Sequence, residues 1–234
     1  MTRFNVSDLL FPARCAICDR VLPFGKEGIC TLCEPKIQYL TGSLCCKCGK
    51  PVKEEEEYCH DCSKRRHWFK EGAALFPYPY IRPSLYRFKY SGRQEYARFY
   101  ARQMALQLTP KVRRWKPQAL VPVPMFRRKK RIRGYNQAEV LSRELSRLWN
   151  FPTLENLVIR VKNTRPMKEI DGTERQNNLK KAFKLGKNDV KLNTIIIIDD
   201  IYTTGSTADA VARICHEAGI GTVYVLSVSI GYGF

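Results

Sequence analysis

The sequence has few histidines and no long apolar run. Its three histidines lie outside the acidic and basic motifs described below, so catalysis by a histidine base is not expected. No stretch approaches the roughly 20 apolar residues of a membrane helix, and the N-terminal apolar segment is too short for a signal peptide. We therefore expect a cytoplasmic protein without a membrane span. The nucleotide-binding pattern GxxxxGK followed by serine or threonine is also missing.

Acidic residues are scarce relative to basic ones. The 234 residues include 41 Lys and Arg but only 22 Asp and Glu, which gives a formal net charge of +19 and a pI near 9.7. Such a charge fits nucleic acid, anionic lipid or a small phosphorylated substrate, and it does not choose among them. Because 44% of the residues are hydrophobic, we expect a folded core, with room for one sizeable domain and a small one.

Cysteine, by contrast, is abundant and unevenly placed. Nine of the ten cysteines lie between residues 15 and 62, and eight of them form four Cys-x-x-Cys pairs. In a reducing compartment such pairs favour metal over disulfides, and each pair suits two corners of a tetrahedron. We predict two structural Zn²⁺ sites built from Cys15, Cys18, Cys30, Cys33, Cys45, Cys48, Cys59 and Cys62. Sequential pairing, first with second and third with fourth, is favoured; a crossed arrangement remains open.

The other cysteines are given no ligand role. Cys46 adjoins Cys45 but lacks the two-residue spacing to Cys48, and Cys215 fits the buried face of a predicted helix. The composition changes sharply after Cys62. We therefore predict a double zinc ribbon at residues 1–66 and a second domain at residues 67–234.

Strands and helices alternate in the second part of the chain. Apolar patterns predict strands at residues 72–78, 119–123, 194–198 and 222–230, and helices at 95–108, 136–149 and 206–218. This order is typical of an α/β fold with a parallel sheet. Residues 194–198 show no alternation, so we expect a central strand that is buried on both faces.

The stretch IIIIDDIYTTGST at residues 195–207 predicts the binding site. In an open parallel sheet, ligands bind beyond the carboxyl ends of the strands, where Asp199 and Asp200 follow the isoleucines. A tight turn into a helix then offers donors to a phosphate, from Thr203, Thr204, Gly205, Ser206 and Thr207. Two acids beside an anion site need hydroxyls or a metal as partners. Phosphoribosyl pyrophosphate, with Mg²⁺ on its diphosphate, supplies both.

These thirteen residues resemble the phosphoribosyl-pyrophosphate signature of type I phosphoribosyltransferases. A second stretch, VPVPMFRRKKRIRGYNQAEVL at residues 121–141, resembles the ComF family of competence proteins, as do FKYSG at 88–92 and RPMKEIDGTERQNNLKKAF at 165–183. The resemblance spans nearly the whole chain. It implies a parallel-sheet type I phosphoribosyltransferase-like domain behind a small N-terminal zinc-ribbon domain. One departure is Met167, where the family often has glutamine.

The resemblance also implies roles for single residues. The 121–124 segment, with Val123 and Pro124, occupies the position of the loop that holds pyrophosphate in similar enzymes. The resemblance brings Arg127, Arg133 and Lys89 to the diphosphate, although a solvated basic loop and simple packing of FKYSG remain open. Residues 165–178 fit the mobile hood that excludes water, with Arg175 and Asn178 as its test residues; a plain surface loop remains the alternative.

Three functions follow from these patterns. The first is a phosphoribosyltransferase that releases pyrophosphate, with Asp199 and Asp200 stabilising a positive ribose. The second, favoured by the ComF resemblance, is a protein of DNA uptake that keeps the donor site and binds single-stranded DNA or recombination proteins. The third is a regulator that senses the donor without chemistry. The acceptor and the oligomeric state stay open, although similar folds often form homodimers.

Overall fold

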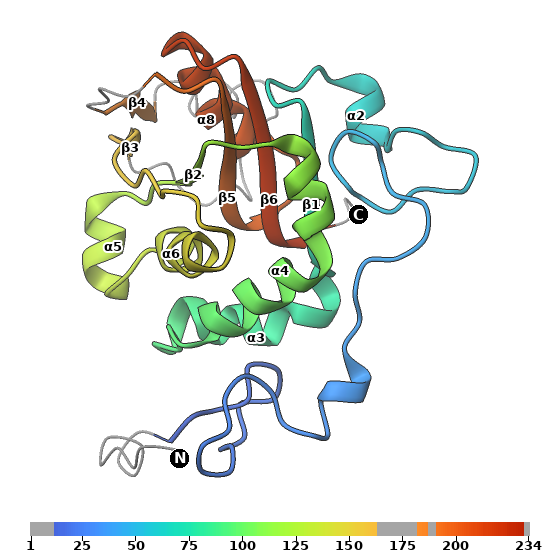
Figure 1. Cartoon of the computed structure of the whole chain (residues 1–234), viewed down its shortest axis with the longest axis vertical. Coiled ribbons are helices and arrows are strands. Elements are labelled where there is room, and N and C mark those ends of the chain that lie inside the picture. Colours follow the sequence, from blue (N-terminus) through green and yellow to red (C-terminus); the bar gives the residue numbers. More distant parts are fainter. Residues whose placement is uncertain (1–11, 163–181, 187–190, 232–234) are drawn as a thin grey trace.

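The main domain is built on a four-stranded parallel sheet. The computed structural model describes residues 12–162, 182–186 and 191–231. Its strands run in the order β1-β6-β5-β2 (Figure 1). Their bounds are β1 Glu71–Pro77, β2 Ala119–Pro122, β5 Thr194–Tyr202 and β6 Thr222–Ile230. The predicted parallel α/β fold is confirmed, and β5 lies inside the sheet with β2 and β6 as parallel neighbours.

Helices and the cysteine-rich segment cover the sheet on both faces. One core contains residues of α3 (Tyr78–Tyr90), α4 (Tyr96–Trp115) and α6 (Gln137–Trp149). The other contains residues of α8 (Ser206–Glu217) and of the two-stranded sheet formed by β3 (Val158–Arg160) and β4 (Phe183–Leu185). Ile195 and Ile197 enter the second core and Ile196 and Ile198 the first, so β5 is buried on both faces as predicted.

The acid pair lies within β5 and not after it. The predicted strand ends at residue 198, but the observed strand continues to Tyr202, with Asp199 opposite Ser227 of β6. The reason is that β6 runs alongside as far as Ile230, so the backbone of residues 199–202 still has a strand to pair with. Both carboxylates therefore start from a fixed strand backbone.

Several helix boundaries also differ from the predicted ones. The helix predicted to end at residue 108 continues to Trp115, whose indole stacks on Tyr224 at 4.4 Å between ring centroids. Leu148 follows the apolar helical spacing of Leu141 and Leu145, which predicts a buried position, but it is 49% exposed. Sequence patterns missed α3, which begins with a proline-rich YPYIRP, and the short basic helix α5 (Arg127–Arg133). Proline in the first turn is compatible with a helix because its missing N–H has no helical partner there.

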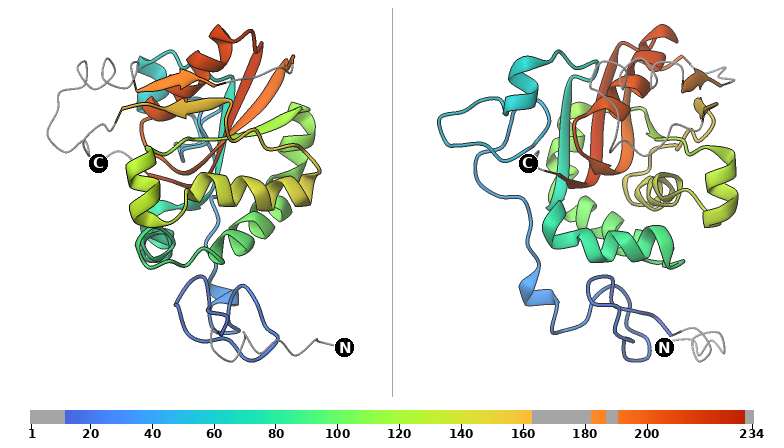
Figure 2. Two further views of the ribbon diagram at one scale, coloured as in Figure 1. Left: turned by 90° about the vertical axis from the view of Figure 1, so that its left-hand side faces the viewer. Right: turned by 180° about the vertical axis from the view of Figure 1, so that it is seen from behind.

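The cysteine-rich segment contains only short helices among its described residues, η1 (Glu34–Lys36) and α2 (His60–Lys64). Its first part lies beyond α3 and α4, and its second part lies beside β1 (Figures 1 and 2). There the N–H of Gly72 donates to the carbonyl of Lys47 at 2.7 Å, and Leu40 donates to Leu75 at 3.1 Å. These bonds protect the edge of the sheet at β1. The domain division at residues 66 and 67 remains a prediction.

Candidate functional site

The acid pair and the 203–207 loop meet at the carboxyl end of β5. Asp199 lines a hollow of about 40 Å³ together with residues 201–208. The loop turns at Gly205, whose φ of +78° lies in the left-handed region, and α8 begins at Ser206. Among the described residues, no side chain caps this helix start, so its first N–H groups have no side-chain acceptor. This geometry suits an anion next to the carboxylate of Asp199, while Asp200 does not line the hollow.

A lysine already neutralises part of the acid pair. The ammonium of Lys89 lies 2.7 Å from Oδ2 of Asp200. Burial lowers the pKa of Lys89, but the charge and hydrogen bond of Asp200 outweigh it, so the net pKa is raised. Burial, followed by the charge of Asp200, raises the pKa of Asp199 well above its ordinary value. A ligand that donates hydroxyls or a cation would relieve this repulsion.

The RGYNQ segment positions that lysine. The hydroxyl of Tyr135 and the amide of Gln137, at 3.3 Å, both donate to the carbonyl of Phe88. The amide of Asn136 donates to the carbonyl of Val123 at 2.9 Å, and the N–H of Val123 donates to Ile198 at 2.9 Å. One motif therefore ties the end of α3, the 121–124 segment and the end of β5 together. Pro124 is buried in the same region.

Of three arginines in the described part of the chain, Arg160, Arg133 and Arg127, only Arg160 interacts with the acid pair. Arg160, at the end of β3, is a residue that sequence reasoning missed; burial lowers its pKa, and the charge of Asp199 acts in the opposite direction. Arg133 lies over the ring of Tyr90 at 4.9 Å and donates to Gln137 at 2.5 Å. Arg127 is exposed at the start of α5. A single arginine in a short apolar strand carries no sequence signal, whereas the 127–133 run does.

The two hood residues, Arg175 and Asn178, lie outside the described residues. The described segments on either side of them pair as an antiparallel ladder, in which Arg160 is opposite Phe183. The described residues on the two sides of this segment therefore lie next to each other, and Arg160 among them is near enough to Asp199 for that charge to act on its pKa.

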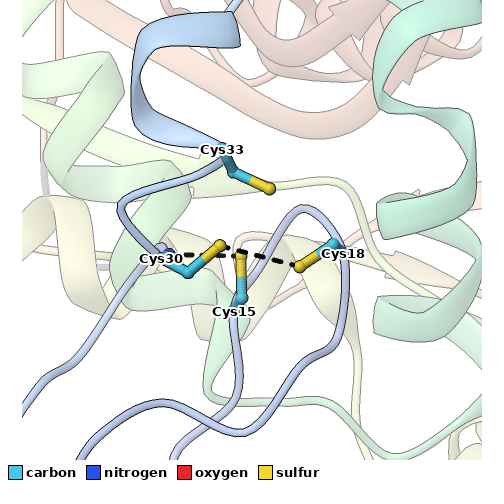
Figure 3. A group of neighbouring side chains, drawn as sticks. All are labelled: Cys15, Cys18, Cys30 and Cys33. Atoms are coloured by element: carbon cyan, nitrogen blue, oxygen red, sulfur yellow. Dashed lines mark hydrogen bonds between the residues drawn. The ribbon is translucent and has the colours of Figure 1, made fainter.

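The eight paired cysteines form two groups of four in sequential order. Within each group the sulfur atoms lie within 4.8 Å of one another, and the crossed arrangement is excluded. In the first cluster, Cys15, Cys18, Cys30 and Cys33 converge from two turns (Figure 3). The second cluster contains Cys45, Cys48, Cys59 and Cys62.

Both clusters fit zinc. A tetrahedral Zn²⁺ with sulfur ligands at about 2.3 Å places the sulfur atoms roughly 3.8 Å apart. The observed distances are 3.8 Å between Cys18 and Cys30 and 3.6 Å between Cys48 and Cys59. A hydrogen bond with Cys62 lowers the pKa of Cys48 to about 6, although burial acts in the opposite direction. This lowered pKa favours the thiolate form of Cys48 near neutral pH. Four protein ligands leave no open position for substrate.

The two remaining cysteines, Cys46 and Cys215, lie outside the clusters as predicted, whereas the contact of His67 with the second cluster was not predicted. Cys46 is exposed and outside both clusters. Cys215 is buried, which raises its pKa to about 12. His67 was given no role from the sequence, yet its Nε2 lies 3.5 Å from the sulfur of Cys62. No helix in the described part of the chain is long and apolar enough to cross a bilayer.

Comparisons with known proteins agree with this architecture. Residues 6–63 match the family model of the double zinc ribbon domain. Competence protein F of Haemophilus influenzae is 32% identical over 224 residues, which are 92% of this chain and 96% of that protein. The DNA utilization protein YhgH of Escherichia coli K12 is 29% identical, over 93% of this chain and 96% of that protein. Competence protein ComFC of Bacillus subtilis is 31% identical, over 82% and 80%.

A search of solved structures gives more distant likenesses. A purine phosphoribosyltransferase from Pyrococcus horikoshii aligns with 56% of this chain and 73% of its own, at 14% identity and a TM-score of 0.37. The sequence relatives share more identity with this chain and align over more than nine-tenths of it. The chain therefore belongs to the family of competence protein F, as its VPVP and RGYNQ motifs predicted.

Proposed function

We propose that this protein binds phosphoribosyl pyrophosphate with Mg²⁺ and acts in DNA uptake during natural transformation. The observation that carries the first part is the hollow shared by Asp199 and the uncapped start of α8. The Asp199 carboxyl offers hydrogen-bond acceptors to a ligand in this hollow, and the hydroxyls and N–H groups of the 203–207 loop offer donors. A sugar with free hydroxyls and a terminal phosphate is complementary to both ends. The second part rests on the relatives, whose names refer to competence and DNA utilization.

Each part of the donor has a candidate partner. The carboxylates of Asp199 and Asp200 accept hydrogen bonds from the ribose hydroxyls, and the 203–207 loop binds the 5-phosphate. The 121–124 segment and Lys89 hold the diphosphate, where Mg²⁺ supplies charge neutralisation. Lys89 reaches this position by leaving Asp200 or by bridging it to the ligand, and Arg160 adds a second cation beside the hood.

Calorimetry with phosphoribosyl pyrophosphate and excess Mg²⁺ tests this site. We expect saturable binding that the double variant Asp199→Asn with Asp200→Asn weakens by at least about a hundredfold, because each lost charged hydrogen bond contributes roughly 1.5–3 kcal/mol. Glu217→Gln, on the far turn of α8, is the matched acid-to-amide control and should bind normally. An absence of heat with the unmodified protein would reject the proposal.

Turnover is a separate question from binding. If the protein is a phosphoribosyltransferase, pyrophosphate is released when a nucleobase or ammonia is added with donor and Mg²⁺, and the double variant abolishes the release. If it senses or carries the donor, binding occurs and pyrophosphate release stays at the rate of the double variant. A coupled pyrophosphatase assay distinguishes the two outcomes. The closed zinc clusters contribute to neither as a catalytic metal.

Single-stranded DNA is the second ligand we propose, on the exposed face of α3. Tyr86 and Tyr90 are 62% and 63% exposed, their ring centroids lie 5.0 Å apart, and Arg133 covers the ring of Tyr90. Arg82 lies beside Tyr86 in the same surface groove. Exposed aromatic rings next to guanidinium groups stack on bases and neutralise phosphates.

Fluorescence anisotropy with a labelled oligonucleotide tests the DNA surface. We expect Tyr86→Ala with Tyr90→Ala to weaken binding by at least tenfold, since stacking contributes about 1–3 kcal/mol per base. Leu106→Ala, an equally exposed apolar residue on α4, is the control. Binding should also fall as salt increases. Unchanged affinity in the tyrosine variant would remove this surface from the proposal.

Location and assembly complete the proposal. All ten cysteines are free of disulfides, which suits the reducing cytoplasm, where recombination proteins would receive the DNA. Light scattering at several concentrations tests for a homodimer. If the cytoplasmic location is correct, we expect the protein to lose its zinc when it is moved to an oxidising compartment.

A further inference from the structure

His67 lies between the second cluster and α8. Its side chain is fully buried. One ring nitrogen, Nδ1, donates to Oδ2 of Asp209 at 2.8 Å, and the other, Nε2, lies 3.5 Å from the sulfur of Cys62. The ring also stacks on Phe69 at 4.8 Å between centroids. The imidazole of His67 therefore connects Asp209 of α8 to Cys62, a predicted zinc ligand.

Asp209 is held from two sides. Its Oδ1 accepts the backbone N–H of Trp68 at 2.8 Å, while Oδ2 accepts from His67. Its own N–H donates to the carbonyl of Gly205 at 2.8 Å, which is the first helical bond of α8. The carboxylate that contacts the cysteine-rich segment therefore belongs to the residue that closes the 203–207 loop.

The side chains of His67 and Tyr202 also pack against the 203–207 loop at Gly205. A Cβ added to Gly205 would meet the hydroxyl of Tyr202 and would lie 3.0 Å from Cε1 of His67. Tyr202 contacts Phe69 edge to face at 6.1 Å. Phe69 and Tyr202 share a core with Cys45, Cys48 and Cys59. The loop thus rests directly on groups that pack against the second cluster.

We propose that His67 is a positioning residue that couples zinc in the second cluster to ligand binding at the 203–207 loop. This inference rests on the proposed function, in which that loop binds the 5-phosphate of phosphoribosyl pyrophosphate. When zinc is bound, Cys62 would be held in place and would orient the imidazole of His67. The imidazole would in turn hold the carboxylate of Asp209 and the start of α8 in position. Because coupling between two binding sites is reciprocal, the donor must also stabilise zinc in this cluster.

Zinc release from the full-length protein tests the coupling. A chromogenic zinc chelator is added with and without phosphoribosyl pyrophosphate in excess Mg²⁺. At equilibrium with the chelator, we expect the donor to raise the affinity of one site for zinc by about tenfold, a factor typical of coupling between sites, and to leave the other unchanged. Cys15→Ser, which removes the first site, identifies the protected ion as that of the second cluster. The Asp199→Asn with Asp200→Asn variant controls for chelation of zinc by the donor.

Two substitutions separate the two bonds of His67. His67→Ala removes both and should weaken donor binding about tenfold or more, the effect of a hydrogen bond to a charged group. His67→Asn places an amide near the position of Nδ1, so donor affinity should recover while protection of zinc is still lost. Simple packing of a buried ring would not produce this split. Circular dichroism and zinc content verify that both variants are folded.

Hydrogen exchange gives a readout that needs no donor. In His67→Ala the amides of residues 203–209 should exchange faster, while those of β2 should not change. If the unmodified protein binds no donor, the proposed function fails, whatever exchange shows. If it binds donor but zinc release is unprotected and His67→Ala binds normally, the coupling is wrong and the proposed function stands.

Discussion

The two cysteine clusters share ligands, spacing and sulfur geometry but meet the rest of the molecule in different ways. The first contributes one buried residue, Ala16, to the core of α3 and α4, and polar contacts add to this, in which Asp19 accepts from Arg93 at 2.9 Å and from Tyr96 at 2.5 Å. A cavity of about 500 Å³ remains between it and the first turns of α4. Three cysteines of the second cluster belong to the core that contains Ile195 and Val211.

The backbone shows the same difference. A Cβ on Gly49 of the second cluster would lie 3.2 Å from the Cα of Ala73, whereas one on Gly28, beside Cys30 of the first cluster, would meet no atom nearer than Cδ2 of Phe99 at 3.9 Å. The turn at Gly49 in the second cluster is therefore tightly packed against β1. We therefore expect zinc in the second cluster to contribute more to the stability of the main domain than zinc in the first.

The largest expected effect comes from comparing Cys45→Ser with Cys15→Ser. Both thiols are buried, so the substitutions are matched. Loss of a structural zinc removes free energy comparable to the roughly 5–15 kcal/mol that stabilises a whole domain. We expect Cys45→Ser to abolish the cooperative thermal unfolding of the sheet and Cys15→Ser to lower its midpoint only slightly, as measured by circular dichroism with zinc content determined in parallel. Equal losses would contradict the distinction between the clusters.

The next effect concerns the loop that rests on the second cluster. Gly205 and Gly219 both have positive φ, +78° and +85°, but only at Gly205 would a Cβ clash with side chains. We expect Gly205→Ala to cost about 2–4 kcal/mol of unfolding free energy and Gly219→Ala about 1 kcal/mol. Urea unfolding measures both. If the two variants are equally stable, the loop is not packed against His67 and Tyr202.

Local sequence patterns and the family resemblance predicted the features that short stretches of sequence determine. Four consecutive isoleucines indicated a strand buried on both faces, and the two-residue spacing of the cysteines indicated paired ligands. Long-range contacts were beyond such reasoning. His67 and Asp209 are 142 residues apart, and neither belongs to a pattern that requires the other. Lys89 was expected near the diphosphate, but its contact with Asp200 depends on how α3 ends at the sheet.

Prolines and side-chain exposure account for the remaining differences. Pro79 and Pro83 concealed α3, although a helix accepts proline in its first turn and tolerates Pro83 here because tertiary packing buries Leu85 and Phe88. Leu148 follows the apolar period of α6 and still lies at the surface, since the helix ends one residue later at Trp149. Periodicity predicts which face is apolar, and it does not predict where the core ends.

A smaller effect is expected at the contact that attaches the first cluster. Burial raises the pKa of Asp19, but hydrogen bonds from Tyr96 and Arg93 outweigh it and leave the pKa below its ordinary value. The contribution of a carboxyl with a lowered pKa is complete above the unfolded value, about 3.9, and is lost as pH falls through the folded value. Asp19→Asn should therefore weaken docking by about 1–2 kcal/mol, equally at every pH from about 5 to 8.

Hydrogen exchange of residues 13–28, measured at pH 6 and pH 8 after correction for intrinsic rates, checks this prediction. The matched control is Asp61→Asn in the second cluster, where Lys50 donates at 2.6 Å and the aspartate pKa is also lowered. Its effect should appear in α2 and leave residues 13–28 unchanged. A difference between the two pH values in Asp19→Asn relative to the parent would show that another titrating group controls docking.

The smallest effect is expected at Cys46, beside the most buried part of the second cluster. Its side chain is exposed and outside the group of four, whereas Cys45 next to it is 3% exposed and within it. Substitutions at exposed sites without special contacts usually change stability by no more than about 0.5 kcal/mol. Cys46→Ser should therefore retain two zinc ions per chain, and its unfolding midpoint should match the parent. Loss of one zinc in this variant would mean that Cys46 replaces Cys45 as a ligand, and the tight packing of the second cluster would then need another explanation.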